Sequence, residues 1–150
     1  MNAQRAGSEV AEALRARMQT PAGTLLVVSL QAVDLTAAVA HEPALYRLPG
    51  NAAGGRDPWL PFDDQAFDAI VLYRMTSHDV DMQLLLGETA RVLRPGGILL
   101  VLEHHADFSF APLPDAGPAH LLHGWLRGAG YAQVEVAAPV GPHLIAIARP

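Results

Sequence analysis

Histidine and acidic side chains recur in the second half of the chain, where they could bind a metal ion or transfer protons. These residues are His78, Glu103, His104, His105, His120 and His123. Imidazole and carboxylate groups serve both as metal ligands and as general acids or bases. A zinc site needs three or four ligands, and no spacing among these residues fixes that geometry. We therefore expect no metal site, and His78, Glu103 and His104 are the acid–base candidates. A binder of a small molecule or metal ion that uses this histidine-rich group is kept as a third possibility.

Apolar runs rich in β-branched residues predict the strands that would position these side chains. Residues 24–30 (TLLVVSL), 67–73 (FDAIVLY) and 98–103 (ILLVLE) are typical of strands buried on both faces. Residues 44–48 predict a brief extended piece before an irregular Gly- and Pro-rich loop. Residues 131–139 and 143–150 predict two final strands. These should pair antiparallel, because no helix lies between them.

Helical periodicity separates the strands. A first helix is expected around residues 8–18 with Ser8 as its cap, a second over residues 34–42, and a fourth over residues 119–127. The third should start at Asp79 or Asp81, bury a stripe from Met82 to Leu93, and end at the sequence RPGG. The alternation predicts one α/β domain over residues 1–150, with a mostly parallel sheet and helices on both faces.

Three residues outside that pattern suggest packing roles. Gly87 lies inside the third helix, where glycine is unfavourable, and this indicates close approach by a neighbouring helix or subunit. Trp59 and Trp125 are expected to pack in the interior.

Composition excludes several classes of protein. The chain has no cysteine, and its net charge of −5 disfavours binding to nucleic acid. Its apolar runs are shorter than the ~20 residues of a membrane span, so we expect a cytoplasmic protein without a membrane partner. Yet 51% of its residues are hydrophobic, which on a small chain predicts some apolar surface left for a partner subunit.

Residues 60–105, LPFDDQAFDAIVLYRMTSHDVDMQLLLGETARVLRPGGILLVLEHH, resemble the second half of a class I S-adenosylmethionine-dependent methyltransferase. The features that carry the resemblance are the LPF approach to a strand, the helix ending in ARVLRPGG and the apolar strand after it. It extends to the C-terminus through HGWLRGAGYAQVEV and HLIAIARP. It implies a Rossmann-like methyltransferase fold whose sheet has an antiparallel C-terminal strand.

The first half departs from this family where the cofactor is normally held. The resemblance implies a glycine-rich turn after the first strand, because side chains there would clash with the cofactor. Here every residue from Ser29 to Val33 carries a Cβ. In relatives, an Asp contacts the adenine amino group near Gly50–Ala52, and Asn51 stands in its place.

The first half is also short. Thr24 and Leu60 are only 36 positions apart, and one βαβ unit takes ~30 residues or more, so about one strand and one helix should be missing. The strand expected to be lost ends, in the family, with the acidic residue that holds the ribose hydroxyls. Losing two charge-assisted hydrogen bonds of ~1.5–3 kcal/mol each lowers affinity by roughly 10² to 10⁴.

The sequence therefore predicts a shortened methyltransferase-like domain that binds S-adenosylmethionine weakly or not at all. Its expected role is an interaction or regulatory subunit, as a homodimer or with another protein. The alternative is an active small-molecule methyltransferase with an unconventional cofactor pocket, so that its being an enzyme stays open. In that case the cofactor would contact Ser29, Gln31, Asn51 and Tyr73, and the catalytic groups would be His78, Glu103 and His104.

Overall fold

The computed structural model describes residues 4–5, 8, 10, 12, 24–30, 44–50, 54–75, 80–108, 117–137 and 143–150. The strands are β1 (Leu25–Ser29), β2 (Ala44–Arg47), β3 (Phe67–Tyr73), β4 (Leu93–His104), β5 (Gln133–Val136) and β6 (His143–Arg149). The helices are α2 (Met82–Val92), α3 (Pro118–Gly128) and the short 3-10 helix η1 (His105–Phe108). The helix expected over residues 34–42 lies outside the described residues. No described helix is long and apolar enough to cross a membrane.

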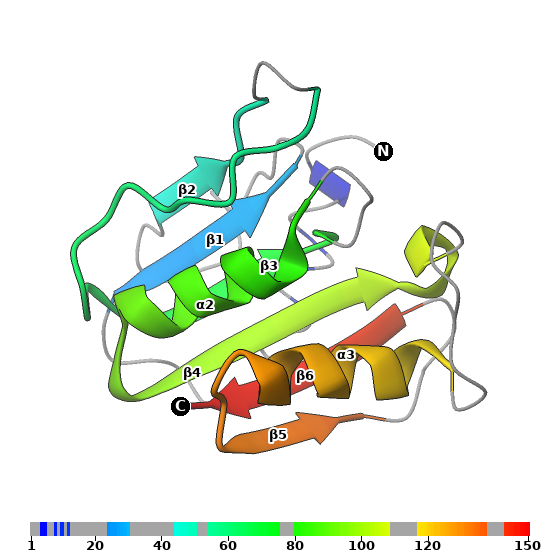
Figure 1. Cartoon of the computed structure of the whole chain (residues 1–150). Coiled ribbons are helices and arrows are strands. Elements are labelled where there is room, and N and C mark those ends of the chain that lie inside the picture. The colour runs from blue at the N-terminus through cyan, green and yellow to red at the C-terminus, as the bar shows by residue number, and fades with distance from the viewer. Residues whose placement is uncertain are drawn as a thin grey trace.

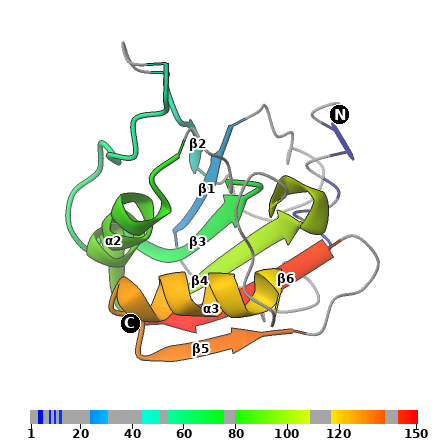
Figure 2. The same cartoon turned by 45° about the vertical axis from the view of Figure 1, so that its right-hand side comes forward.

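Within the described residues, six strands form one sheet in the order β2-β1-β3-β4-β6-β5. The strands β2, β1, β3 and β4 run parallel, whereas β6 pairs antiparallel with both β4 and β5. Helices α2 and α3 lie side by side on one face of the sheet, as Figures 1 and 2 show from two directions. This arrangement confirms the expected α/β fold and its antiparallel C-terminal strands. The strand next to β1, which the sequence analysis expected to be lost, is however present as β2.

The core consists of two apolar clusters, one on each face of the sheet. Residues Leu26, Val28, Ile70, Leu72 and Leu99 face α2 and α3. Their alternating neighbours in β1, β3 and β4 form the second cluster, which includes Val27, Val71, Tyr73, Leu100 and Leu102. This alternation is the period-two pattern of a strand, and it explains why the central parts of these strands are apolar at successive positions.

The end of α2 differs from the sequence expectation. The helix begins after Asp81, whose Oδ1 accepts a hydrogen bond from the Leu84 amide at 3.1 Å, which confirms one of the two expected caps. It ends at Val92, however, and Leu93 is the buried first residue of β4, paired with Phe67. The RPGG sequence therefore lies within the irregular start of β4. A Cβ on Gly97 would lie 2.8 Å from the Arg94 carbonyl oxygen, so a glycine is needed there.

Two further expectations are wrong in detail, and a third is not tested by the described residues. Ser8 does not cap the first helix: it is itself helical, and its Oγ donates to the Gln4 carbonyl at 3.0 Å. Trp59 is 57% exposed, although Trp125 does pack, against the ring of Phe108. Gly87 is exposed and a Cβ there would meet nothing within 4 Å, so no described part of the chain explains this glycine.

A hydrogen-bonded ion pair on α2 holds the chain that leads into β3. The Arg91 guanidinium bonds both carboxylate oxygens of Glu88, at 2.7 and 3.0 Å. It also donates to the carbonyls of Leu60 and Phe62, each at 2.9 Å, and to Asp64 Oδ1 at 2.8 Å. Glu88 Oε1 in turn accepts the Leu60 amide at 3.0 Å. We call this group the 60–64 clamp. It lowers the pKa of Glu88, mainly through the bond from Arg91.

Two smaller contacts tie the remaining elements together. Asp68 Oδ2 accepts the Thr24 amide at 2.9 Å and Arg94 Nη1 at 2.8 Å, which joins the starts of β1, β3 and β4. These bonds, that from Thr24 first, lower the pKa of Asp68. The buried Tyr131 hydroxyl lies 2.6 Å from Thr89 Oγ1 and so links α2 to the turn after α3. Burial raises the pKa of Tyr131.

Replacing Glu88 with Gln should destabilise the protein by about 1–3 kcal/mol, because it removes the negative charge that bonds the Arg91 guanidinium in the 60–64 clamp. The pKa of Glu88 is lowered in the folded protein, so its stabilisation is present above the ordinary value of 4.5 and is lost as the pH falls through the folded value. Urea unfolding from about pH 7 to about pH 3 should therefore show a flatter acid limb in Glu88→Gln. The exposed Glu135→Gln is the matched control. Equal pH dependence in wild type and Glu88→Gln would contradict this role.

Replacing Gly87 with Ala should raise the free energy of unfolding by about 1 kcal/mol, since the position is helical and open. Thermal unfolding at several protein concentrations measures this. A loss of stability that appears only at high concentration would instead reveal a partner packed on Gly87.

Candidate functional site

The carboxyl ends of β2, β1, β3 and β4 meet along one edge of the sheet, because these strands are parallel. In the register of the sheet, Ser29 is opposite Arg47 on one side and Tyr73 on the other. Glu103 and His104 end β4 next to them. Ligands of open α/β sheets usually bind beyond this edge. We call these five residues the strand-end rim.

The predicted site residues of the strand-end rim do not all lie on one face of the sheet. Ser29 and Tyr73 continue the alternation of Val27 and Val71, so they lie on the second face of the sheet. Glu103 is one residue beyond Leu102 of that same cluster and therefore points toward the opposite face, the face covered by α2 and α3. Tyr73 and Glu103 thus lie on opposite faces of the sheet at the ends of β3 and β4.

Glu103 has a structural partner in the main chain. Its side chain is fully buried, and Oε1 accepts the Met75 amide at 3.0 Å. Since Met75 follows the end of β3, this carboxylate fastens that segment to β4.

An ion pair links the ends of β3 and β4. Arg74, with a left-handed φ of 51°, donates its amide to the Leu102 carbonyl at 2.8 Å. Its Nε and Nη2 bond the two carboxylate oxygens of Asp107 in η1, each at 2.9 Å. The pair with Asp107, more than its contact with Tyr73, raises the pKa of Arg74. This two-pronged geometry holds η1 beside the rim.

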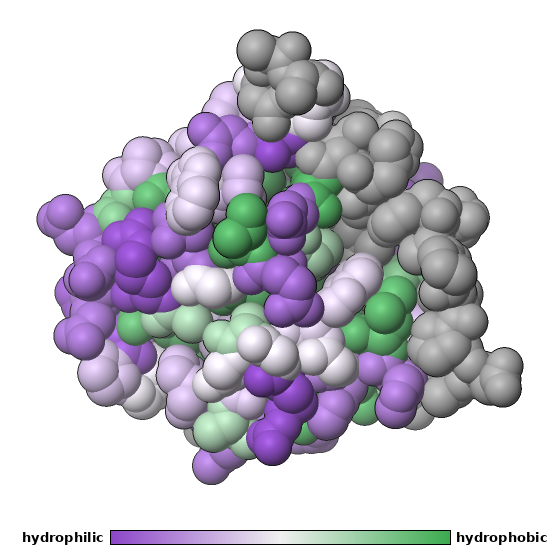
Figure 3. Space-filling model, viewed as in Figure 1, coloured by the Kyte–Doolittle hydropathy of each residue, from purple (hydrophilic) through white to green (hydrophobic). Residues whose placement is uncertain are grey.

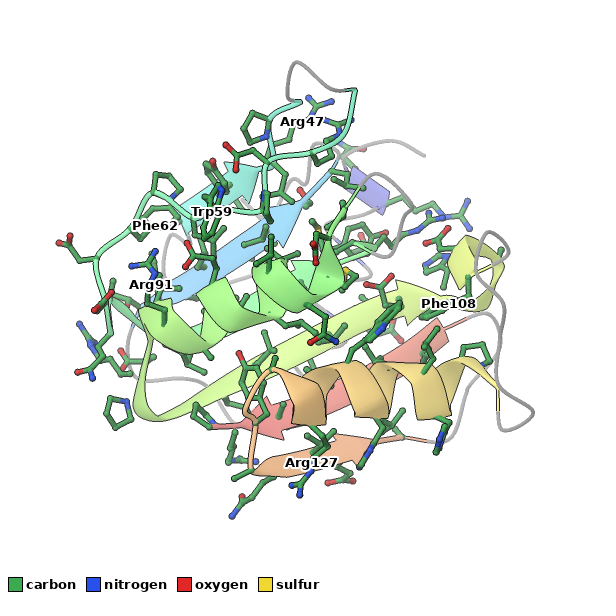
Figure 4. All side chains as sticks on the ribbon, in the orientation of Figure 1. Arg47, Trp59, Phe62, Arg91, Phe108 and Arg127 are labelled. Carbon is green, nitrogen blue, oxygen red and sulfur yellow. The ribbon has the colours of Figure 1, made fainter. Side chains whose placement is uncertain are left out.

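The end of β2 carries positive charge. Arg47 Nε donates to the Leu30 carbonyl at 3.1 Å, and Arg56 Nη1 donates to the Leu48 carbonyl at 3.1 Å. The Leu48 amide bonds the Ser29 carbonyl at 3.0 Å, so the chain after β2 stays against the end of β1. In Figure 4, Arg47 projects beyond the tip of the β2 arrow. Two guanidinium groups thus belong to the segment that closes the end of β1.

The structure leaves several sequence candidates untested. His78, Gln31 and Asn51 lie outside the described residues, as does the side chain of His105. His104 is half-buried. Within the described part of the chain, no three His, Cys, Asp or Glu side chains are grouped so that they could hold a metal ion. His120 and His123 are exposed on α3.

Sequence reasoning did not single out Arg47 or Arg56. Arg47 ends a strand that was expected only as a brief extended piece, and Arg56 lies in an irregular loop. The only sequence signal was the position of Arg47 at the end of an apolar run. The bond between Arg74 and Asp107 joins residues 33 positions apart, which no local pattern could indicate.

Known proteins of similar sequence are methyltransferases. The chain is 39% identical over 66 residues to a demethylmenaquinone methyltransferase from Mycobacterium marinum, a match that covers 44% of this chain and 26% of that protein. The chain thus matches only about a quarter of that relative's length.

Solved structures of the same fold cover nearly the whole chain. A SAM-dependent methyltransferase from Thermotoga maritima has a TM-score of 0.62 at 15% identity, covering 95% of this chain and 88% of that one. A methyltransferase from Haloferax volcanii, solved in complex with the activator Trm112, has a TM-score of 0.59 at 16% identity, covering 97% and 90%. The family model of the methyltransferase domain matches residues 10–101. The chain therefore belongs to the class I S-adenosylmethionine-dependent methyltransferase superfamily.

Proposed function

We propose that this protein keeps the methyltransferase fold but binds S-adenosylmethionine weakly or not at all, and works as an interaction or regulatory subunit. The observation that carries the proposal is Arg47 at the end of β2, bonded to the Leu30 carbonyl. The resemblance implies an acidic residue at the end of the strand next to β1, where it accepts hydrogen bonds from the ribose hydroxyls of the cofactor.

A guanidinium group cannot replace that carboxylate. It has five N–H donors and no acceptor, so Arg47 cannot receive the hydroxyl protons of a ribose. The sequence after β1 argues in the same direction, because Ser29 to Val33 contains no glycine. The residues at this rim do not fit S-adenosylmethionine in the manner that the family implies.

The position of the predicted catalytic residue Glu103 supports the same proposal. Glu103 is engaged by the Met75 amide and points away from the face that carries Tyr73. An acid–base pair needs both groups within reach of one substrate proton. Glu103 therefore does not share a face of the sheet with Tyr73 and His104, which follow the alternation of Val71 and Leu102.

The β2 edge of the sheet is the surface on which a partner subunit would bind. Within the described residues, β2 is a four-residue strand at the edge of the sheet, and its Leu45 is 53% exposed. Trp59, in the loop between β2 and β3, is 57% exposed. On the face that carries α2 and α3, by contrast, hydrophobic residues reach the surface only in separate places among hydrophilic ones (Figure 3). An open sheet edge can pair with another chain, and a second copy is the simplest such chain. A complex between a chain of this fold and another protein is known from Haloferax volcanii, where a methyltransferase is bound to the activator Trm112.

A working small-molecule methyltransferase is the second candidate. It is favoured by the sequence match to demethylmenaquinone methyltransferases, which are enzymes. Cofactor affinity separates the two candidates directly.

Isothermal titration of the wild-type protein with S-adenosylmethionine and S-adenosylhomocysteine should give a Kd of about a millimolar or weaker, because the ribose hydroxyls lack acceptors. Arg47→Glu should bind more tightly than wild type, since it supplies a carboxylate at the end of β2. Arg149→Glu makes the same charge change on an exposed residue at the end of β6 and should bind as wild type does. A micromolar Kd for the wild-type protein would overturn the proposal and favour the enzyme.

Light scattering after gel filtration should show a dimer at micromolar concentration, and Leu45→Lys should convert it to monomer by placing a charge at the β2 edge. Leu84→Lys is the matched control, because Leu84 is 44% exposed on α2 rather than at the sheet edge. A wild-type monomer, or a dimer untouched by Leu45→Lys, would exclude pairing through β2.

A further inference from the structure

We propose that β2 pairs antiparallel with β2 of a second copy of this chain, about a two-fold axis that passes between the two Tyr46 residues. The pairing rests on the proposed role of an interaction subunit and deepens it, because it fixes the symmetry and the register of the contact. Two six-stranded sheets would join into one continuous sheet. The contact is built from residues 44–48, all of which the structure describes.

Alternate residues of β2 direct their main-chain groups away from β1. The two strands are parallel, and the Leu48 amide bonds the Ser29 carbonyl at 3.0 Å. Only every second residue of a strand bonds a given parallel neighbour, so Tyr46 faces β1 as Leu48 does. The N–H and C=O groups of Leu45 and Arg47 therefore point outward. Within the described part of the chain, no strand lies on that side of β2.

The side chains at this edge are exposed on the second face of the sheet. Leu45 is opposite Val27 in the register, so it lies on the same face as that residue. It is 53% exposed, and Arg47 on the same face is exposed too. Tyr46 lies on the opposite face, where its ring packs edge-on against Phe62 at 5.7 Å between centroids. An exposed leucine beside outward main-chain groups favours the addition of a strand.

Symmetry limits the registers that two copies can adopt. Residues directly opposite each other in an antiparallel pair point to the same face of the sheet. A two-fold axis perpendicular to the sheet keeps every residue on its own face. Leu45 can therefore be opposite Leu45 or Arg47 of the second copy, but not opposite Tyr46. The axis must pass at Leu45, Tyr46 or Arg47.

Charge and hydrogen bonding select the axis at Tyr46. An axis at Arg47 sets two guanidinium groups opposite each other, and like charges in that position are destabilising. An axis at Leu45 sets Arg47 against residue 43, a proline with no N–H to donate. An axis at Tyr46 sets Leu45 against Arg47 in both directions. Every outward N–H and C=O group of these two residues is then bonded.

The same register covers the exposed leucine. Arg47 would lie opposite Leu45 of the second copy, where its aliphatic stem can cover the leucine while the guanidinium stays in water. Arg47 Nε is already bonded to the Leu30 carbonyl at 3.1 Å, which restricts the stem. The two Tyr46 residues meet at the axis as a non-hydrogen-bonded pair, the closer kind of antiparallel pair. Aromatic pairs in this position are stabilising.

The rival occupant of this edge is β5, which lies at the other edge of the described sheet. Its exposed Glu135 complements the charge of Arg47. Pairing of β2 with β5 of another copy, however, leaves one free edge at each end of every assembly, so copies add without limit. The pair of β2 strands closes after two copies.

Disulfide cross-linking reports the register, because the chain has no cysteine of its own. Tyr46→Cys should cross-link to itself on mild oxidation, since Cα atoms of a non-hydrogen-bonded pair are ~4.5 Å apart. Leu45→Cys and Arg47→Cys should each give little cross-linking alone, because diagonal neighbours are ~7–8 Å apart. A mixture of these two variants should cross-link. Leu84→Cys, exposed on α2, is the control.

Tyr46 packs against Phe62, so the melting temperature of Tyr46→Cys must be measured. The mixture of Leu45→Cys and Arg47→Cys tests the same register with Tyr46 intact. Self-cross-linking of Leu45→Cys or Arg47→Cys would overturn the register. Cross-linking of Arg47→Cys to Glu135→Cys would assign the edge to β5, and no cross-link in any folded variant would overturn the pairing of β2 strands.

These outcomes are separate from those of the proposed function. A dimer in light scattering that gives none of the cross-links would overturn this contact and leave the role of an interaction subunit standing. A micromolar Kd for S-adenosylmethionine in a protein that does cross-link would overturn that role and leave the contact standing.

Discussion

The 60–64 clamp is the interaction on which the described fold depends most. The chain leaves β2 at the edge of the sheet and must return to the start of β3, with β1 between the two strands. No described helix makes this return; an irregular loop does, and it passes beside α2 (Figure 1). Arg91 and Glu88 satisfy the amide and carbonyl of Leu60 and the carbonyl of Phe62, which would otherwise lack partners in a loop packed on a helix. The charged side chains of Glu88 and Arg91 therefore have a structural role.

The same bonds account for two sequences that this chain shares with the methyltransferase family. The sequences LPF and ETARVL contain part of the resemblance to the methyltransferase family. In the structure their polar groups bond one another, and the ring of Phe62 packs edge-on against Phe67 at 5.0 Å between centroids. A motif of this kind specifies how two segments are joined. It can persist in a chain whose cofactor contacts differ.

Much of the fold could be predicted from sequence because the strands of the parallel core are apolar on both faces, as in residues 69–73. The cap at Asp81 was equally accessible, since its effect is local. The end of α2 was not, because Leu93 leaves the helix to pair with Phe67, 26 positions away, and no local pattern reports that pairing. The same holds for the site. Periodicity could place Tyr73 and Glu103 at strand ends, but the faces that they occupy follow only from the register of the whole sheet.

The central claim is that a donor-only side chain, Arg47, stands where this fold otherwise places an acceptor for the ribose of its cofactor. Amide NMR spectra of the labelled protein test it most directly, because Leu30 and Leu48 report on the ends of β1 and β2. With S-adenosylhomocysteine in excess, we expect the resonances of these two amides to stay unshifted. A saturable shift of both at micromolar ligand would contradict the account.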